Sequence, residues 1–219
     1  MDQPAKTKEE YILQHCSPED PLLAELNRQT WLKILNPKMI SGHYQGKFLE
    51  MISYMIRPSQ ILEIGTYTGY SAICMARGLK EGGQLHTIDS NDEIREFALG
   101  YIRKSGMQDR IVMHTGNALE IIPALEGPFD LIFIDGEKSE YSDYYDLVFP
   151  KVREGGFIIA DNALWDDKVY RPEFSDDEDT VCLKDFNEMI SRDNRVENLL
   201  LSIRDGLMII RKKHKKSSA

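Results

Sequence analysis

Short apolar runs alternate with amphipathic stretches along most of the chain, a pattern typical of an α/β protein. The apolar runs are bounded by Gly, Pro, Asn or Asp and predict buried strands, while apolar residues three or four apart predict helices. Strands are predicted at residues 61–64, 84–89, 110–114, 130–135, 157–161, 196–203 and 207–211. Helices are predicted to begin near residues 17–21 and to cover 44–56, 72–76, 92–104, 118–122, 141–149 and 181–192, the last after a polar loop at 163–179.

Strands that alternate with helices form a parallel sheet, so the predicted fold class is α/β with a Rossmann-like doubly wound sheet of seven strands. The dipeptide Asp205-Gly206 predicts a hairpin, which makes the last strand antiparallel to its neighbour. A single domain is expected over residues 1–219, with a helical extension at 1–57, the sheet core at 58–211 and a basic tail at 212–219.

The first strand runs into a glycine-punctuated turn, Glu63-Ile-Gly65-Thr-Tyr-Thr-Gly69. A strand, a turn of this kind and a helix N-terminus form the nucleotide-side crevice of a doubly wound sheet. The spacing differs from the Gly-x-Gly-x-x-Gly of dinucleotide binders, which disfavours an NAD-binding module. An acid two positions before the first glycine would repel a pyrophosphate but suits an ammonium group. The turn therefore predicts S-adenosylmethionine (SAM), which has an α-ammonium, a sulfonium and no phosphate.

Carboxylates end four of the predicted strands, at Glu63, Asp89, Asp135 and Asp161. The carboxyl ends of parallel strands lie along one edge of a sheet, so these side chains are expected to meet where ligands bind. Asp89 follows Gly65 by 24 residues and matches the carboxylate that binds ribose hydroxyls. The alternatives are that Asp89 caps the next helix and that backbone amides of the turn satisfy Glu63.

Two further residues are expected near the donor. Ser71 stands at the start of the helix that follows the turn, and Ala118 lies in the segment where an adenine ring would sit. The structural alternatives are that Ser71 only forms hydrogen bonds at the helix start and that Ala118 is only part of a short helix.

Asp135, Asp161 and Asn162 offer hard oxygen ligands, which favour Mg²⁺, Mn²⁺ or Ca²⁺ over Zn²⁺. Mg²⁺ in particular takes one or two carboxylates and leaves positions for water or substrate oxygens. The alternative is a capping network at two turns that holds no metal. Lys138 lies three residues after Asp135, where it could take a proton from an acidic oxygen near the metal.

The charge balance limits the partners that this chain can bind. Its 219 residues carry a formal net charge of −9, which disfavours a nucleic-acid partner because such binding depends on Lys and Arg. The three cysteines form no Cys-x-x-Cys pair, and the sequence shows neither a signal peptide nor an apolar run long enough to cross a membrane. A cytoplasmic protein with reduced thiols is expected.

Four segments resemble the motifs of one enzyme family. They are Leu62-Glu-Ile-Gly-Thr-Tyr-Thr-Gly-Tyr-Ser71, Asp135-Gly-Glu-Lys-Ser-Glu-Tyr141, Asp161-Asn-Ala-Leu-Trp165 and Asp205-Gly-Leu-Met-Ile-Ile-Arg211. From about Met39 onward the chain is similar to the cation-dependent class I O-methyltransferases, the family of the caffeoyl-CoA and catechol O-methyltransferases and their bacterial relatives. The chain departs from the family pattern at Gly136-Glu137, at Asp167 in place of a glycine, and in an acidic run at 175–179.

The resemblance implies a role for each of several residues. It implies SAM contacts at Ser41, Glu63, Gly65, Thr66, Ser71, Asp89, Ala118 and Asp135. It implies a divalent metal, with Mg²⁺ the first candidate, on Asp135, Asp161 and Asn162, and a general base at Lys138. Trp165 is expected in the acceptor wall, Tyr44 is expected as a further acceptor contact, and a homodimer is expected for the assembly.

The expected function is transfer of the SAM methyl group to a hydroxyl of a small vicinal diol, in particular a catechol, with a divalent cation. Two alternatives stay open. Some bacterial relatives methylate 5-hydroxyuridine in tRNA, and the basic segment 211–216 would suit a nucleic acid, although the net charge disfavours it. The other alternative is a SAM-binding protein without turnover, in which the altered 135–141 segment no longer holds a metal.

Overall fold

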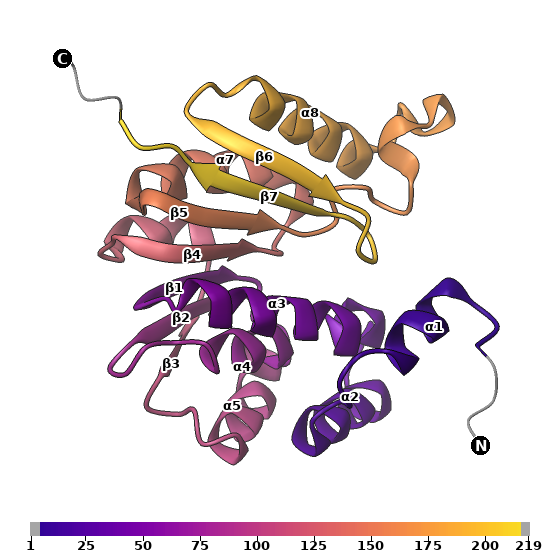
Figure 1. Ribbon diagram of the computed structural model, residues 1–219, viewed down its shortest axis with the longest axis vertical. Helices are drawn as coiled ribbons and strands as arrows, with labels where there is room; N and C mark the ends of the chain where they lie inside the picture. The colour runs from indigo at the N-terminus through magenta and orange to yellow at the C-terminus, as the bar shows by residue number, and fades with distance from the viewer. Residues whose placement is uncertain (1–4, 216–219) are drawn as a thin grey trace.

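Seven strands form one mixed sheet in the computed structural model, which describes residues 5–215 of the chain (Figure 1). The strands are β1 (Gln60–Ile64), β2 (Gln84–Asp89), β3 (Ile111–Thr115), β4 (Phe129–Ile134), β5 (Val152–Ala160), β6 (Val196–Leu201) and β7 (Leu207–Lys212). Their order across the sheet is β3-β2-β1-β4-β5-β7-β6. Strands β1 to β5 pair in parallel, whereas β7 runs antiparallel to β5 and β6. The predicted doubly wound α/β sheet with an antiparallel last strand is therefore confirmed.

Helices cover both faces of the sheet, with α3 on one face and α7 on the other (Figure 1). The α-helices are α1 (Lys8–Gln14), α2 (Pro21–Lys33), α3 (Gly42–Ile56), α4 (Tyr70–Ala76), α5 (Arg95–Lys104), α6 (Ala118–Ile121), α7 (Tyr141–Val148) and α8 (Glu178–Arg192). The short 3-10 helices are η1 (Pro37–Met39), η2 (Asp92–Ile94), η3 (Ile122–Ala124), η4 (Lys138–Glu140), η5 (Phe149–Lys151), η6 (Lys168–Tyr170) and η7 (Pro172–Phe174). Within residues 5–215, none of the helices is both long and apolar enough to cross a bilayer.

Successive strand residues point to opposite faces of the sheet and so build two apolar cores. Leu62 and Ile132 belong to the core that α7 and α8 cover. Their neighbours Ile61 and Leu131 belong to the core that α3, α4 and α5 cover. Because both faces are covered, the central strands are apolar at consecutive positions, which is why they were recognisable as short continuous apolar runs.

The helical extension before β1 follows local capping signals. Helix α2 begins at Pro21, and the Asp20 carboxylate accepts hydrogen bonds from the backbone N–H groups of Leu22 and Leu23, as the helix start predicted at 17–21 requires. Helix α1 was not predicted as a separate element. Its sequence signal is a capping box, in which Thr7 and Glu10 bond each other's backbone N–H groups.

Several element boundaries differ from the prediction, most clearly those of β5 and α8. Strand β5 begins at Val152 rather than at Phe157, and its pairing register with β4 shifts between Phe129 and Leu131. A glycine pair at 155–156 therefore lies inside an irregular strand and not in a loop before it. Helix α8 begins at Glu178 rather than at 181, because the side chain of Asp177 caps it by accepting from Thr180 N.

The C-terminal strand also extends past its predicted end. Lys212 is the last residue of β7, and its ammonium group donates to the carbonyl oxygens of Phe149 (2.8 Å) and Val152 (2.7 Å). The predicted basic tail therefore starts one residue later in the structure. Residues 216–219 of that tail, like residues 1–4 of the predicted extension, lie outside the described part of the chain.

The turn after β1 lies directly against the turn after β4. Gly65 adopts φ 101°, and a Cβ atom at this position would lie 2.1 Å from the carbonyl oxygen of Asp135. Asp135 N donates to Ile64 O, and Gly65 N donates to Ile88 O, each at 2.8 Å. The turns after three neighbouring strands are thus tied together, and only a glycine fits between two of them.

We predict that Gly65→Ala lowers the free energy of unfolding by about 3 kcal/mol, since it combines a left-handed backbone with a severe overlap. Gly106→Ala is the matched control, because Gly106 also has a positive φ (72°) but no atom lies within 4 Å of its Cβ position. The control should cost about 1–2 kcal/mol. Chemical denaturation of both variants measures the difference, and equal losses would contradict the proposed overlap.

Candidate active site

A cavity of about 1200 Å³ lies at the carboxyl edge of β1, β2, β4 and β5. The strand order reverses between β1 and β4, and doubly wound sheets bind ligands at such a reversal. The predicted site residues that line the cavity are Gly65, Asp89, Ala118, Asp135, Lys138, Asp161, Asn162 and Trp165. The structure therefore brings the predicted donor, metal and acceptor residues into one space.

The other predicted site residues lie behind the cavity wall. Thr66 is buried, and its hydroxyl is 2.5 Å from that of Thr87. Ser71 is buried in the first turn of α4, and Ser41 is buried at the start of α3. Tyr44 is half-buried on α3 and does not line the cavity, whereas its neighbour Gln45 does.

Asp89 ends β2 and organises the turn beside it. One carboxylate oxygen accepts from Tyr67 N at 2.6 Å, and the other accepts from Asn91 N at 2.9 Å. The helix that follows is capped by Asn91, whose side chain accepts from Glu93 N. Asp89 is therefore not the helix cap, and it lines the cavity next to the Gly65 turn.

Asp135 and Lys138 form an ion pair after β4. The Lys138 ammonium group donates to Asp135 Oδ1 at 3.2 Å and to the Tyr141 hydroxyl at 3.0 Å. Burial raises the pKa of Asp135 above its usual value, although Lys138 opposes that shift. Burial alone would lower the pKa of Lys138, but Tyr141 and Asp135 outweigh it and raise that pKa. Lys138 is therefore positively charged in the free protein.

Asp161 follows β5 and is tied to helix α3. Gln45 Nε2 donates to Asp161 Oδ2 at 2.5 Å, and Asn162 N donates to Asp161 Oδ1 at 2.7 Å. Burial, followed by repulsion from Asp135, raises the pKa of Asp161 to about 7. The site thus holds two carboxylates close enough to disfavour each other's charge.

The chemistry of these side chains fits a hard divalent cation. Asn162 donates its amide N–H to Asp205 Oδ2 at 3.0 Å, which leaves its amide oxygen as an acceptor, and it lines the same cavity as the two carboxylates. Two carboxylates and an amide oxygen are ligands that Mg²⁺ accepts, and a cation would offset the repulsion between Asp135 and Asp161. No group of three or more His, Cys, Asp or Glu side chains that could hold a metal occurs among residues 5–215.

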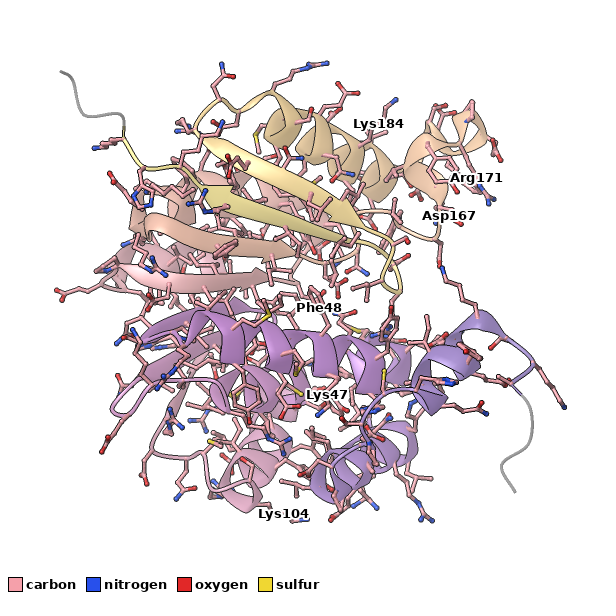
Figure 2. All side chains as sticks on the ribbon, viewed as in Figure 1. Lys47, Phe48, Lys104, Asp167, Arg171 and Lys184 are labelled. Atoms are coloured by element: carbon pink, nitrogen blue, oxygen red, sulfur yellow. The ribbon has the colours of Figure 1, made fainter. Side chains whose placement is uncertain are left out.

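The opposite end of the cavity is formed by the segment between β5 and α8. Trp165 and the next two residues all have positive φ, and Asp167 has φ 62°. Asp is among the residues that tolerate this conformation, so Asp167 can stand where the resemblance implies a glycine. Figure 2 shows Asp167 within this segment, on the side of the molecule where α1 lies. Glu9 of α1 also lines the cavity.

A sequence model of the family described as O-methyltransferase matches residues 13–213. The chain belongs to the O-methyltransferase family. It is similar to a catechol O-methyltransferase of Niastella koreensis, with 33% identity over 84% of this chain and 84% of that protein. It is also similar to caffeoyl-CoA O-methyltransferase 1 of Eucalyptus globulus, with 34% identity over 80% of this chain and 75% of that protein.

The fold comparison agrees with the sequence comparison. An O-methyltransferase from Bacillus cereus, solved in complex with SAH, superposes with a TM-score of 0.86 and 30% identity over 93% of this chain and 96% of that chain. The resemblance inferred from the four motifs is therefore confirmed at the level of the family.

Several cavity residues of this O-methyltransferase were not predicted individually. Gln45 and Arg204 are the main examples, and both reach across the fold: Gln45 bonds Asp161, and Arg204 bonds backbone carbonyls of residues 38, 40 and 41. Gln45 sits in an amphipathic helix with no local signal for its role. The only sequence signal for Arg204 is its place before the Asp205-Gly206 turn.

Glu63 is fully buried beneath the donor turn of this O-methyltransferase. Its Oε2 accepts from the Thr87 hydroxyl at 2.6 Å, while Oε1 has no hydrogen-bond partner in the described part of the chain. Burial raises the pKa of Glu63 to about 8. The group is therefore largely protonated at neutral pH in the free protein, and a nearby positive charge would be needed to ionise it.

We predict that Glu63→Gln stabilises the free protein only at high pH. The folded pKa of Glu63 lies above its usual value of 4.5, so wild type loses stability as pH rises from about 4.5 to about 8, whereas glutamine does not titrate. The variant should lie within about 1 kcal/mol of wild type at pH 5 and exceed it by about 4–5 kcal/mol at pH 9, because each unit between the two pKa values is worth about 1.4 kcal/mol. Urea unfolding at both pH values measures this, and a pH-independent difference would contradict the raised pKa.

Proposed function

We propose that this O-methyltransferase transfers the methyl group of SAM to one hydroxyl of a small vicinal diol, in particular a catechol, with a divalent cation. The main support for the proposal is that residues predicted to bind SAM and residues predicted to bind the metal line the same cavity. The names of two relatives, a catechol and a caffeoyl-CoA O-methyltransferase, support an acceptor with adjacent oxygens. We also propose a cytoplasmic homodimer, as the family resemblance implies.

The donor half of the proposal rests on the edge of β1 and β2. Gly65, Asp89 and Ala118 line this edge of the cavity. The glycine lets its turn pack against the Asp135 backbone, Asp89 can accept from ribose hydroxyls, and Ala118 offers a small apolar contact for an adenine ring. Beneath the turn, the Glu63 carboxylate is buried without a full set of donors. A donor with an ammonium and a sulfonium group suits this carboxylate-rich end, and SAH in the Bacillus cereus relative supports the choice.

The divalent cation is proposed to bind at the turns that follow β4 and β5. Asp135, Asp161 and the Asn162 amide oxygen would hold the cation, with Mg²⁺ the first candidate and Mn²⁺ or Ca²⁺ as others. When bound, the cation would supply positive charge that lowers the pKa of an acceptor hydroxyl. The Gln45 amide and the Asn162 backbone hold the Asp161 carboxylate in place through two hydrogen bonds.

Proton transfer is assigned to Lys138. As the acceptor oxygen attacks the methyl carbon, the O–CH₃ bond forms, the C–S bond breaks and SAH leaves, and the hydroxyl proton passes to Lys138 Nζ. In the free protein Lys138 is charged because Asp135 and Tyr141 raise its pKa. Lys138 can therefore act as a base only after it has lost its own proton to solvent. Positive charge held at Asp135 would favour that loss, which links the base to the metal ligands.

The acceptor end favours a small molecule over tRNA or a CoA thioester. Among the described residues, ten carboxylate side chains and three cationic ones line the cavity. Two of the three cations are engaged, Lys138 with Asp135 and Arg204 with backbone carbonyls. A phosphate-bearing acceptor would meet repulsion there. Trp165 supplies an aromatic wall for a catechol ring, while Tyr44 remains a predicted contact.

We predict that EDTA abolishes methyl transfer to catechols while SAM still binds, and that Mg²⁺ or Mn²⁺ restores transfer. Asp161→Ala should resemble EDTA treatment but resist rescue, because it removes a ligand. Asp143→Ala is the control, an exposed carboxylate on α7. Radiolabelled methyl transfer gives the rate, and calorimetry gives SAM affinity.

The same assay, run with different acceptor molecules, distinguishes the proposed function from its alternatives. Catechols should react far faster than monophenols of the same shape, because a single oxygen cannot chelate. Equal rates on the two, or full activity in EDTA, would remove the metal from the proposal. Transfer to tRNA that falls steeply with salt would favour the nucleic-acid alternative, and SAM binding with no transfer to any acceptor would favour the protein without turnover.

We also predict that Asp89→Ala weakens SAM binding by about 1.5–3 kcal/mol, since a charged hydrogen-bond acceptor is lost. Asp89→Asn, which keeps one carboxyl-type oxygen for Tyr67 N or Asn91 N, should lose less. Asp92→Asn is the control, an exposed acid three residues further on. Calorimetry of all three variants tests the assignment, and unchanged affinity in Asp89→Ala would exclude the ribose role.

A further inference from the structure

We propose that Arg204 is a positioning residue that holds segment 38–41 as one wall of the donor cavity and so sets the affinity for SAM and SAH. Arg204 lies in the turn between β6 and β7, more than 160 residues away in sequence from the segment that it holds. The proposal rests on the proposed function, because it concerns the same donor site.

Arg204 makes a clamp of three hydrogen bonds to backbone carbonyls. Nη1 donates to Ile40 O at 2.9 Å and to Ser41 O, and Nη2 donates to Lys38 O at 3.5 Å. These carbonyls belong to η1 and to the two residues between η1 and α3. Lys38, Met39 and Arg204 all line that cavity.

The hydrogen-bond partners of Arg204 suit a clamp, although its charge also acts at longer range on Asp135. Within residues 5–215 no salt bridge involves Arg204, so its guanidinium bonds only to neutral carbonyl oxygens. The planar fork of arginine can reach several acceptors at once, which a lysine ammonium on a flexible stem does less well. The side chain therefore fixes the path of segment 38–41 by geometry.

The backbone of Arg204 gives an independent reason to look for a role. Its φ is 47°, in the left-handed region that arginine adopts only at an energetic cost and glycine adopts freely. The backbone alone thus favours glycine at this position. The hydrogen bonds of the side chain to segment 38–41 explain why arginine stands there instead. Such an outlier next to a cavity supports a functional interpretation.

The clamp is linked to the reacting end of the cavity as well. The next residue, Asp205, accepts from Asn162 Nδ2 at 3.0 Å and from Asp166 N at 2.5 Å. The 204–205 turn therefore connects the segment over the donor with the predicted metal ligand and the acceptor wall. Releasing segment 38–41 should mainly speed the loss of bound donor or product.

Arg204→Gly separates this role from a merely structural one. The substitution removes the clamp but relieves the left-handed backbone, so the melting temperature should stay the same or rise while the dissociation constants for SAM and SAH rise about tenfold or more. Arg204→Lys should bind with intermediate affinity. The KM for a catechol at saturating SAM should change much less than the KM for SAM.

Arg57→Gly is the matched control. Arg57 also has a left-handed backbone, with φ 51°, at the other end of α3, and no hydrogen bond or ion pair of its side chain occurs in the described chain. This variant should show the same relief of the backbone with unchanged donor affinity. Similar donor affinity in Arg204→Gly and Arg57→Gly would overturn the clamp.

Amide hydrogen exchange tests the clamp without any ligand. The Met39 and Ile40 amides are bonded to Asn36 O and Pro37 O, and they should exchange at least tenfold faster in Arg204→Gly than in Arg57→Gly or wild type. Equal exchange in all three proteins would also overturn the clamp. If wild type bound neither SAM nor SAH, the proposed function would fail, and this exchange result would still decide whether Arg204 holds the segment.

Discussion

The close backbone contact between Gly65 and Asp135 is the constraint on which the rest of the site depends. A side chain at Gly65 would overlap the Asp135 carbonyl oxygen, so the turns after β1 and β4 share a space that admits no Cβ. Because these strands are neighbours at the reversal of strand order, the donor turn and the first predicted metal ligand are brought together by backbone packing. Lys138, three residues further on, then reaches back to Asp135 without help from another element.

This arrangement buries several carboxylates, and burial destabilises their charged forms. Burial raises the pKa values of Glu63, Asp135 and Asp161 above their usual range, which means that the fold disfavours their charged forms. Side-chain donors offset part of this cost: Thr87 donates to Glu63, Lys138 to Asp135 and Gln45 to Asp161. Stability alone would favour neutral side chains here. The clustering of such groups at one cavity fits a site whose ligands bring positive charge, as SAM and a divalent cation do.

The sequence predicts the parts of this protein that depend on local pattern. The central strands, the Gly65 turn and the acids that follow the strands could be recognised because periodicity and strand direction place them. The role of Gln45, the clamp at Arg204 and the early start of β5 could not, because each depends on a partner distant in sequence: Gln45 meets Asp161 and Arg204 meets segment 38–41. The capping box of α1 was a local signal, but nothing in it indicates that Glu9 lines the cavity.

The two ends of the cavity are therefore built in different ways. The proposed donor end is set by the sheet edge, whereas the proposed acceptor end is made of loops that long-range hydrogen bonds hold in place. Asp205 O accepts from Leu164 N at 2.8 Å, and the Asp205 side chain accepts from Asn162, while the adjacent Arg204 holds segment 38–41. The acceptor wall and the segment over the donor thus share one turn. A substitution that reshapes the acceptor wall through this turn should also alter donor binding, so the two affinities cannot change independently there.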